Sequence, residues 1–166
     1  KKSLKYSLKY FIPFTRKASF ENTSKMSIAA SLSGSAISIS KTTAPHAISY
    51  PFTSIYGVSH GHAVSLTLEK FLIFNYEKMK FAKSNFDLKK RYELIFELTK
   101  TKNILELVNY IKKIKKLANL NDNLLDLGID VSKDYSKIIA GVNLLRLKNN
   151  PILINQSDLK SILFSL

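Results

Sequence analysis

The sequence predicts an all-α fold built from several amphipathic helices. From Leu107 to Leu120, apolar residues recur at three- and four-residue spacing while lysines lie on the opposite face, the pattern of a helix with one buried side. Similar segments recur along the chain, separated by polar joints such as Asn149-Asn150-Pro151. No segment shows the sustained alternation of apolar and polar residues that a half-buried strand requires. The fold class is therefore multi-helical, without a sheet.

Two helices are predicted before residue 41. The first spans residues 1–14 and ends at Pro13, because proline cannot continue the backbone hydrogen bonding of a helix. The second spans residues 21–39, and its many small residues imply close packing against neighbouring helices. Its Ile, Leu and Ala content favours a buried helix over a flexible Ser-rich linker. The candidate N-caps of the second helix are Asn22, Thr23 and Ser24.

A pair of helices is predicted around the histidines. The first begins near Pro45, bends at Pro51 and ends near Gly57, because proline disturbs a helix interior and glycine commonly ends a helix. The second begins near His60 and continues as an apolar helix to about Asn75. Such a pair folds the two helices back toward each other.

Amphipathic helices and polar joints continue to the C-terminus. Gly128 offers a residue for a positive φ angle, and either Asp130 or Ser132 can cap the helix that follows. The run Ile152–Ile154 is interpreted as an extended connector and not as a strand. The predicted helices are approximately residues 86–98, 103–119, 132–147 and 157–163.

The composition is that of a folded domain. The chain has 166 residues, of which 45% are hydrophobic and 23% charged, so as one globular domain it can bury roughly 70% of its unfolded surface. The absence of Cys excludes a disulfide framework and a thiolate zinc site, and it favours a reducing compartment. No apolar run reaches the ~20 residues that a membrane helix needs. We therefore expect a soluble cytoplasmic protein that does not enter a membrane.

The net charge of +14 raises the question of a nucleic-acid partner. The lysines are scattered over most of the chain, and the densest run, at Ile111–Lys116, follows helical periodicity. This run is interpreted as a solvated helix face formed by Lys112, Lys113, Lys115 and Lys116. No recognisable nucleic-acid-binding motif is present, so we expect no nucleic-acid partner.

All three histidines lie in the segment Lys41–Leu68. Imidazole is the commonest protein ligand of transition metals, so this concentration suggests a single site. His46 and His60 are fourteen positions apart, and the bend between them can bring their rings together. A zinc or iron site usually needs about three or four protein ligands, and no Asp or Glu lies between Asn22 and Thr67. The ligand set within this segment is therefore incomplete.

The same residues carry a resemblance to a known family. His46, then Tyr50 and Pro51, then the pair His60-Gly61 match a motif of the iron-containing (group III) alcohol dehydrogenases. The surrounding stretches, SKTTAPHAISYP and SHGHAVSL, look most like the phosphonoacetaldehyde reductase branch of that family. The resemblance extends from about residue 22 to the C-terminus, where GVNLLRLKNNPILINQSDLKSIL is similar to the closing helices of relatives.

This resemblance implies a fold, a metal and a cofactor. The chain resembles the helical, dehydroquinate synthase-like C-terminal half of these enzymes, with His46 and His60 as ligands of one divalent iron or zinc. In relatives, an Asp and usually a His or Gln from an earlier helix complete the site, and an N-terminal domain binds NAD(P). This chain has no Gly-rich dinucleotide-binding turn, so residues 1–166 are expected to be a single metal-binding domain of a larger protein, inactive alone.

Tyr50 occupies a position that is often a catalytic or relay histidine in relatives. A phenol does not exchange protons at neutral pH as an imidazole does, but it can donate a hydrogen bond to a substrate oxygen. Tyr50 is therefore the candidate catalytic residue. The alternative is a tyrosine that only packs against the bend at Pro51.

The substrate implied by the resemblance is a small aldehyde or alcohol, with a phosphonate group in the branch named above. Lys41 is the candidate for substrate choice because a cation beside the metal histidines neutralises a phosphonate, and Thr42 and Thr43 add hydroxyl donors. The alternative is a solvent-facing lysine in a loop. His62 lies about 200° around a helix from His60, so it is predicted to line the substrate cleft, with a plain surface histidine as the alternative.

A function of another class also fits the sequence. The lysine-rich helices could belong to a non-catalytic basic helical module that binds a protein partner or an anionic surface. Loss of metal after mutation of His46 and His60 separates the two hypotheses. For the enzyme, the resemblance also implies a homodimer.

Overall fold

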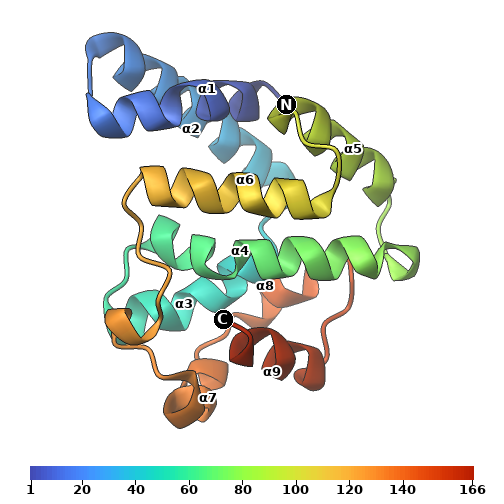
Figure 1. Ribbon diagram of the computed structural model, residues 1–166. Helices are drawn as coiled ribbons and strands as arrows, with labels where there is room; N and C mark the ends of the chain where they lie inside the picture. Colours follow the sequence, from blue (N-terminus) through green and yellow to red (C-terminus); the bar gives the residue numbers. More distant parts are fainter. The chain divides into compact units, whose positions relative to one another are not determined.

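The computed structural model describes residues 1–166 and contains helices and no strand, which confirms the all-α prediction. The chain divides into two compact units (Figure 1). The first unit comprises Lys1–Lys41 and Glu93–Asn119, and the second comprises Thr42–Tyr92 and Leu120–Leu166. None of the helices has both the length and the apolar character needed to cross a lipid bilayer.

The first unit contains α1 (Lys2–Arg16), α2 (Phe20–Ser40), the end of α5 (Leu88–Thr99) and α6 (Ile104–Leu117). Helices α1 and α2 pack side by side (Figure 1). The side-chain hydroxyl of Ser3 donates a hydrogen bond to the carbonyl of Ala29 at 2.8 Å, and Ala29 is buried. The small residues of α2 thus permit the close approach that the sequence predicted, at least against α1.

Three predictions for the first two helices were wrong. Helix α1 does not end at Pro13, because proline removes only its own donor and the helix closes one turn later, where the Lys17 N–H donates to the Pro13 carbonyl at 2.9 Å. The N-cap of α2 is Ser19, whose hydroxyl accepts from the backbone of Asn22. Helix α2 is also largely exposed, with Ile39 at 86% of its full accessibility, because its apolar residues do not share one face.

The lysines of α6 do not all face solvent. Lys112, Lys113 and Lys116 are exposed, but Lys115 is only 5% exposed. Lys115 lies seven residues after the buried Val108, so it falls on the same face of the helix as the apolar stripe. The expectation of a fully solvated lysine face was wrong at this position.

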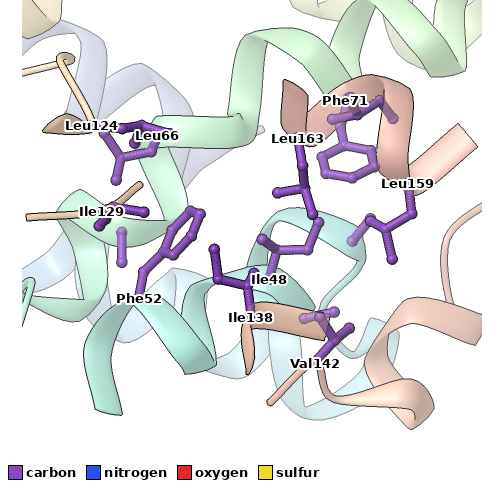
Figure 2. Packing of buried hydrophobic residues seen from close by; sticks show 14 of the residues in the cluster. Ile48, Phe52, Leu66, Phe71, Leu124, Ile129, Ile138, Val142, Leu159 and Leu163 are labelled. Atoms are coloured by element: carbon purple, nitrogen blue, oxygen red, sulfur yellow. The ribbon is translucent and has the colours of Figure 1, made fainter. Parts of the chain in front are cut away.

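The second unit holds the main hydrophobic core. Helix α3 (Ala44–Tyr56) packs on α4 (His60–Glu77), α7 (Val131–Ala140) and α8 (Leu144–Lys148), while α9 (Gln156–Phe164) contacts α4 and α7. Two 3₁₀ turns, η1 (Met79–Phe81) and η2 (Leu125–Leu127), and the start of α5 complete the unit. Figure 2 shows the buried side chains that fill the space between these helices, among them Ile48, Phe52, Phe71, Ile138 and Leu163.

The bend and the turn predicted between the histidines are present. Pro51 lies inside α3, and Gly57 ends α3 in the left-handed conformation with φ of 70°. Because Pro51 has no N–H, the carbonyl of Ala47, four residues earlier, has no partner within the helix. This carbonyl instead accepts a hydrogen bond from the backbone N–H of Asn143, at 3.2 Å. The proline thus creates a docking point for the segment that leads into α8.

The single helix predicted over residues 132–147 was wrong. Helix α7 ends at Ala140, and α8 begins at Leu144 after Asn143, whose side chain accepts from the Arg146 N–H at 3.0 Å. The helix breaks here because Asn143 caps a new helix while its own N–H is bound to α3. The break directs α8 across α3.

Gly141 allows this close approach, and its replacement tests the docking. An added Cβ would lie 2.9 Å from the Cβ of Pro51, closer than real Cβ contacts. We expect Gly141→Ala to destabilise the protein by about 1–3 kcal/mol, measured by urea unfolding, because the packed backbone must shift. Gly34→Ala in α2 is the control, since nothing lies within 4 Å of its added Cβ and alanine favours a helix. Equal stability changes in both variants would contradict the docking.

The predicted signals after residue 120 are present in the structure. Gly128 has a positive φ of 75°, and Asp130 is the N-cap of α7, accepting from the backbone of Ser132 and Lys133. The Ser132 hydroxyl, then the backbone N–H and the ammonium of Lys133, lower the pKa of Asp130 to about 2. Helix α8 ends before Pro151, and the connector after it forms no strand. The buried side chain of Asn150 holds the connector by donating to the Ile152 carbonyl at 2.8 Å.

Candidate metal centre

The two histidines predicted to bind metal lie together. His46 is in the first turn of α3 and His60 is the first residue of α4, and the packing of the two helices places their ring centroids 5.1 Å apart at an interplanar angle of 48°. His46 is half-buried and His60 is exposed. The pair therefore lies where further ligands can reach it.

The spacing of the two rings fits a shared ion. With metal–nitrogen bonds of about 2.0–2.1 Å, two imidazoles on one tetrahedral ion have ring centroids roughly 5 Å apart. The donor set is incomplete, because no cluster of three or more His, Cys, Asp or Glu able to hold a metal occurs in the chain. The pair fits a metal as half of a site.

Ser49 orients the His60 ring. Its buried hydroxyl donates to the carbonyl of His46 at 2.8 Å and lies 3.4 Å from Nδ1 of His60. Since the hydroxyl proton is already used, the Ser49 oxygen faces Nδ1 as an acceptor. This arrangement favours the tautomer with the proton on Nδ1 and leaves Nε2 of His60 free to bind a metal.

His46 is held in the form that binds metals. Burial, together with the nearby charges of His60 and Arg146, lowers the pKa of His46 below its ordinary value. A lowered pKa favours the neutral imidazole at neutral pH, and the neutral form has the lone pair that a metal ligand needs. The environment of His46 therefore suits metal binding before any metal arrives.

Tyr50 and Arg146 lie beside the histidine pair. The Tyr50 ring meets the His60 ring edge-on, with centroids 6.4 Å apart, and Tyr50 is 37% exposed. The guanidinium of Arg146, from α8, lies 5.6 Å from the centroid of the Tyr50 ring. The guanidinium also donates to the hydroxyl of Thr42. Helices α3 and α8 thus place a phenol and a cation next to the candidate metal ligands.

The other predicted substrate residues have different surroundings. Thr42 is buried, and its carbonyl accepts from the Asn149 side chain at 3.0 Å. Thr43 is the N-cap residue of α3, although its side chain makes no capping bond. Lys41 ends α2 in the first unit with φ of 63°, and its ammonium donates to the Ser38 carbonyl at 3.0 Å. Roles of these residues in substrate binding stay predictions.

His62 makes its contact away from the histidine pair. Its Nε2 lies 2.7 Å from the carbonyl of Asn121, in the segment before η2. Because a carbonyl only accepts, Nε2 of His62 carries the proton in this contact. The predicted role of His62 in the substrate cleft stays a prediction.

Sequence reasoning missed Ser49 and Arg146. Ser49 lies three residues after His46, which puts both on one helix face, and that spacing was the available signal. Arg146 lies far along the chain, and no motif connects it to the histidines. Its residue type was a weak signal, since only Arg16, Arg91 and Arg146 are arginines among the 26 basic residues.

Comparison with known proteins agrees with this geometry. The family model for the C-terminal part of the Fe-containing alcohol dehydrogenases matches residues 14–166. The chain belongs to the iron-containing alcohol dehydrogenase family. This confirms the family predicted from the histidine motif. One relative is a phosphonoacetaldehyde reductase of Streptomyces viridochromogenes, which is 48% identical to this chain over 48 residues. Those residues are 29% of this chain and 12% of that protein.

Two solved structures share the fold. A sulfoacetaldehyde reductase from Bifidobacterium kashiwanohense in complex with NAD+ has a TM-score of 0.80 and 24% identity. A mutant of ADH/D1, an archaeal halo-thermophilic alcohol dehydrogenase from a Red Sea brine pool, has a TM-score of 0.82 and 21% identity. Each match covers 99% of this chain and 42% of the solved chain. This iron-containing alcohol dehydrogenase chain therefore spans less than half the length of the relatives it matches.

Proposed function

We propose that this chain is the metal-binding C-terminal half of an NAD(P)-dependent aldehyde reductase, with His46 and His60 as two ligands of a divalent iron or zinc. The observation that supports this proposal most directly is the 5.1 Å separation between the ring centroids of His46 and His60. The helices that bear these rings belong to the part of the chain that matches the family's C-terminal part. In this proposal the remaining ligands and the cofactor site lie in segments outside residues 1–166, which is supported by the match to the C-terminal part of the family and by the 42% coverage of the solved chains.

The residues of the site have distinct tasks in this reaction. A bound metal supplies Lewis-acid polarisation of the substrate carbonyl, while the nicotinamide supplies the hydride. His46 and His60 hold the metal as neutral ligands, and Ser49 holds the His60 ring. Tyr50, which is 37% exposed and whose ring contacts His60, donates a hydrogen bond from its hydroxyl to a substrate oxygen. Neither histidine carries hydride or substrate.

The proposed substrate is a short aldehyde with an anionic group, such as phosphonoacetaldehyde, which is reduced to 2-hydroxyethylphosphonate. The local match to a phosphonoacetaldehyde reductase supports this choice, as does the fold shared with a sulfoacetaldehyde reductase. Lys41, Thr42, Thr43 and His62 remain candidates for contacting the substrate. A homodimer, a cytoplasmic location and the lack of a nucleic-acid partner also stay predictions.

Metal depletion tests the proposal. The complete enzyme that contains this chain should reduce an aldehyde with NADH or NADPH, lose turnover after treatment with a chelator, and regain it with iron or zinc. The isolated chain of residues 1–166 should show no turnover, because half of the ligands and the cofactor site are missing. Unchanged aldehyde reduction by metal-free enzyme, or robust NADH oxidation by the isolated chain, contradicts the proposed function.

A further inference from the structure

The guanidinium of Arg146 has the properties of an anion-binding group. It donates to the Thr42 hydroxyl and lies near the Tyr50 ring, 5.6 Å from the ring centroid. A guanidinium has five N–H donors, and Thr42 accepts from only one of its nitrogens, so several donors remain. Arg146 also has no carboxylate partner, unlike the lysines that pair with Glu97, Asp158, Asp87 and Asp130.

The backbone holds Arg146 at a defined place. The Asn143 N–H binds the Ala47 carbonyl of α3, and the Asn143 side chain caps the helix that carries Arg146. Stacking on Tyr50 and the bond to Thr42 then limit the rotation of the long arginine side chain. Such a preorganised fork matches the oxygen atoms of a tetrahedral oxyanion better than a flexible lysine does.

Arg146 is also close to the metal ligands. Tyr50, which contacts the Arg146 guanidinium, lies four residues after His46 in α3, so Tyr50 and His46 share one face of that helix. The Tyr50 ring contacts both groups, with its centroid 5.6 Å from the Arg146 guanidinium and 6.4 Å from the centroid of the His60 ring. A substrate that places its carbonyl at the histidine pair and carries an anion a short distance away would meet this guanidinium.

Given the aldehyde reductase activity proposed above, we propose that Arg146 binds the anionic group of the substrate. Its guanidinium, which contacts Thr42 and Tyr50 next to the histidine pair, takes a phosphonate or sulfonate on a short-chain aldehyde. Neutral aldehydes of similar size make no such contact. Arg146 therefore selects anionic over neutral aldehydes and has no part in the chemistry at the carbonyl.

Steady-state kinetics of the complete, metal-loaded enzyme test this role. Arg146→Gln should lower kcat/KM for phosphonoacetaldehyde and sulfoacetaldehyde by about 10- to 100-fold, as expected for a lost charge-assisted hydrogen bond. The same variant should change kcat/KM for propionaldehyde by less than about threefold, because a neutral aldehyde lacks the charge that makes this bond strong. Lys148→Gln is the matched control, since it removes an exposed cation from the same helix and should leave all three values unchanged.

Two further measurements keep the outcome decisive. Methylphosphonate, an anion without a carbonyl, should inhibit propionaldehyde reduction by the wild type and by Lys148→Gln, and much less in Arg146→Gln. Arg146→Lys keeps the charge and a donor for Thr42, so it should fold normally and show an intermediate loss for the anionic aldehydes.

The possible failures are distinguishable. If Arg146→Gln and Arg146→Lys reduce all three aldehydes as the wild type does, or lose activity equally on all three, anion selection by Arg146 is wrong while the reductase proposal stands. If the complete wild-type enzyme reduces no aldehyde, the proposed function fails, and the role of Arg146 fails with it.

Discussion

Replacing His46 by alanine should remove the metal from the complete enzyme, and His60→Ala should do the same. In the proposed site each imidazole is one of a small number of ligands, and the rings lie at the spacing expected for a shared ion. Loss of the Lewis acid removes several kcal/mol of transition-state stabilisation, so kcat should fall by about a thousandfold or more. Metal content by mass spectrometry and turnover with a neutral aldehyde provide the two readouts.

His62→Ala is the control for metal content. His62 is the remaining histidine, and its ring contacts the Asn121 carbonyl away from the pair, so this variant should retain its metal. If the His46 and His60 variants keep the metal content and folding stability of the wild type, the alternative of a non-catalytic basic helical module is favoured. Loss of metal in the His62 variant alone would instead show that the ligands were assigned incorrectly.

Phe52→Ala should produce the largest loss of stability. Phe52 of α3 is fully buried in the core of the second unit, where Figure 2 shows it near Leu66 of α4 and near Leu124 and Ile129 of the segment before α7. Truncating a buried phenylalanine typically costs about 3–5 kcal/mol, through lost burial and the cavity left behind. This is a large part of the roughly 5–15 kcal/mol that stabilises a typical domain. Urea unfolding followed by circular dichroism measures the change.

Phe20→Ala makes the same chemical change at an exposed position. Phe20 begins α2 and is 92% exposed, so its truncation should alter the free energy of unfolding by less than about 0.5 kcal/mol. Comparable losses in the two variants would argue against the packing described for α3. The contrast also separates a core defect from a general effect of removing an aromatic ring.

Much of the fold followed from local patterns. Helical periodicity gave the fold class, and Gly57, Gly128 and Pro151 marked turns and helix ends, because glycine tolerates a positive φ and proline cannot continue a helix. The wrong helix over 132–147 had a tertiary cause. Helix α7 ends at Ala140 because the backbone N–H of Asn143 donates to the Ala47 carbonyl of α3. A local sequence pattern does not indicate a hydrogen-bond partner so distant in sequence.

Only part of the candidate site was predictable from the sequence. His46 and His60 stood out because their spacing and neighbours match a family motif, and the structure places their rings together. Ser49 and Arg146 acquire their relevance only through packing: one is buried against the His60 ring, and the other arrives on a helix from the far end of the chain. The residue type and sequence spacing of such residues do not reveal their role.

The hydrogen bond between the Ala47 carbonyl and the Asn143 N–H limits which substitutions this sequence can accept. The carbonyl is available only while residue 51 lacks an amide hydrogen, so any other amino acid at that position would compete with Asn143 for the same oxygen. Gly141 is restricted by the same proline, whose ring leaves no space for a side chain there. Positions 51, 141 and 143 should therefore vary together across homologues, and a change at one of them is tolerable only with compensation at the others.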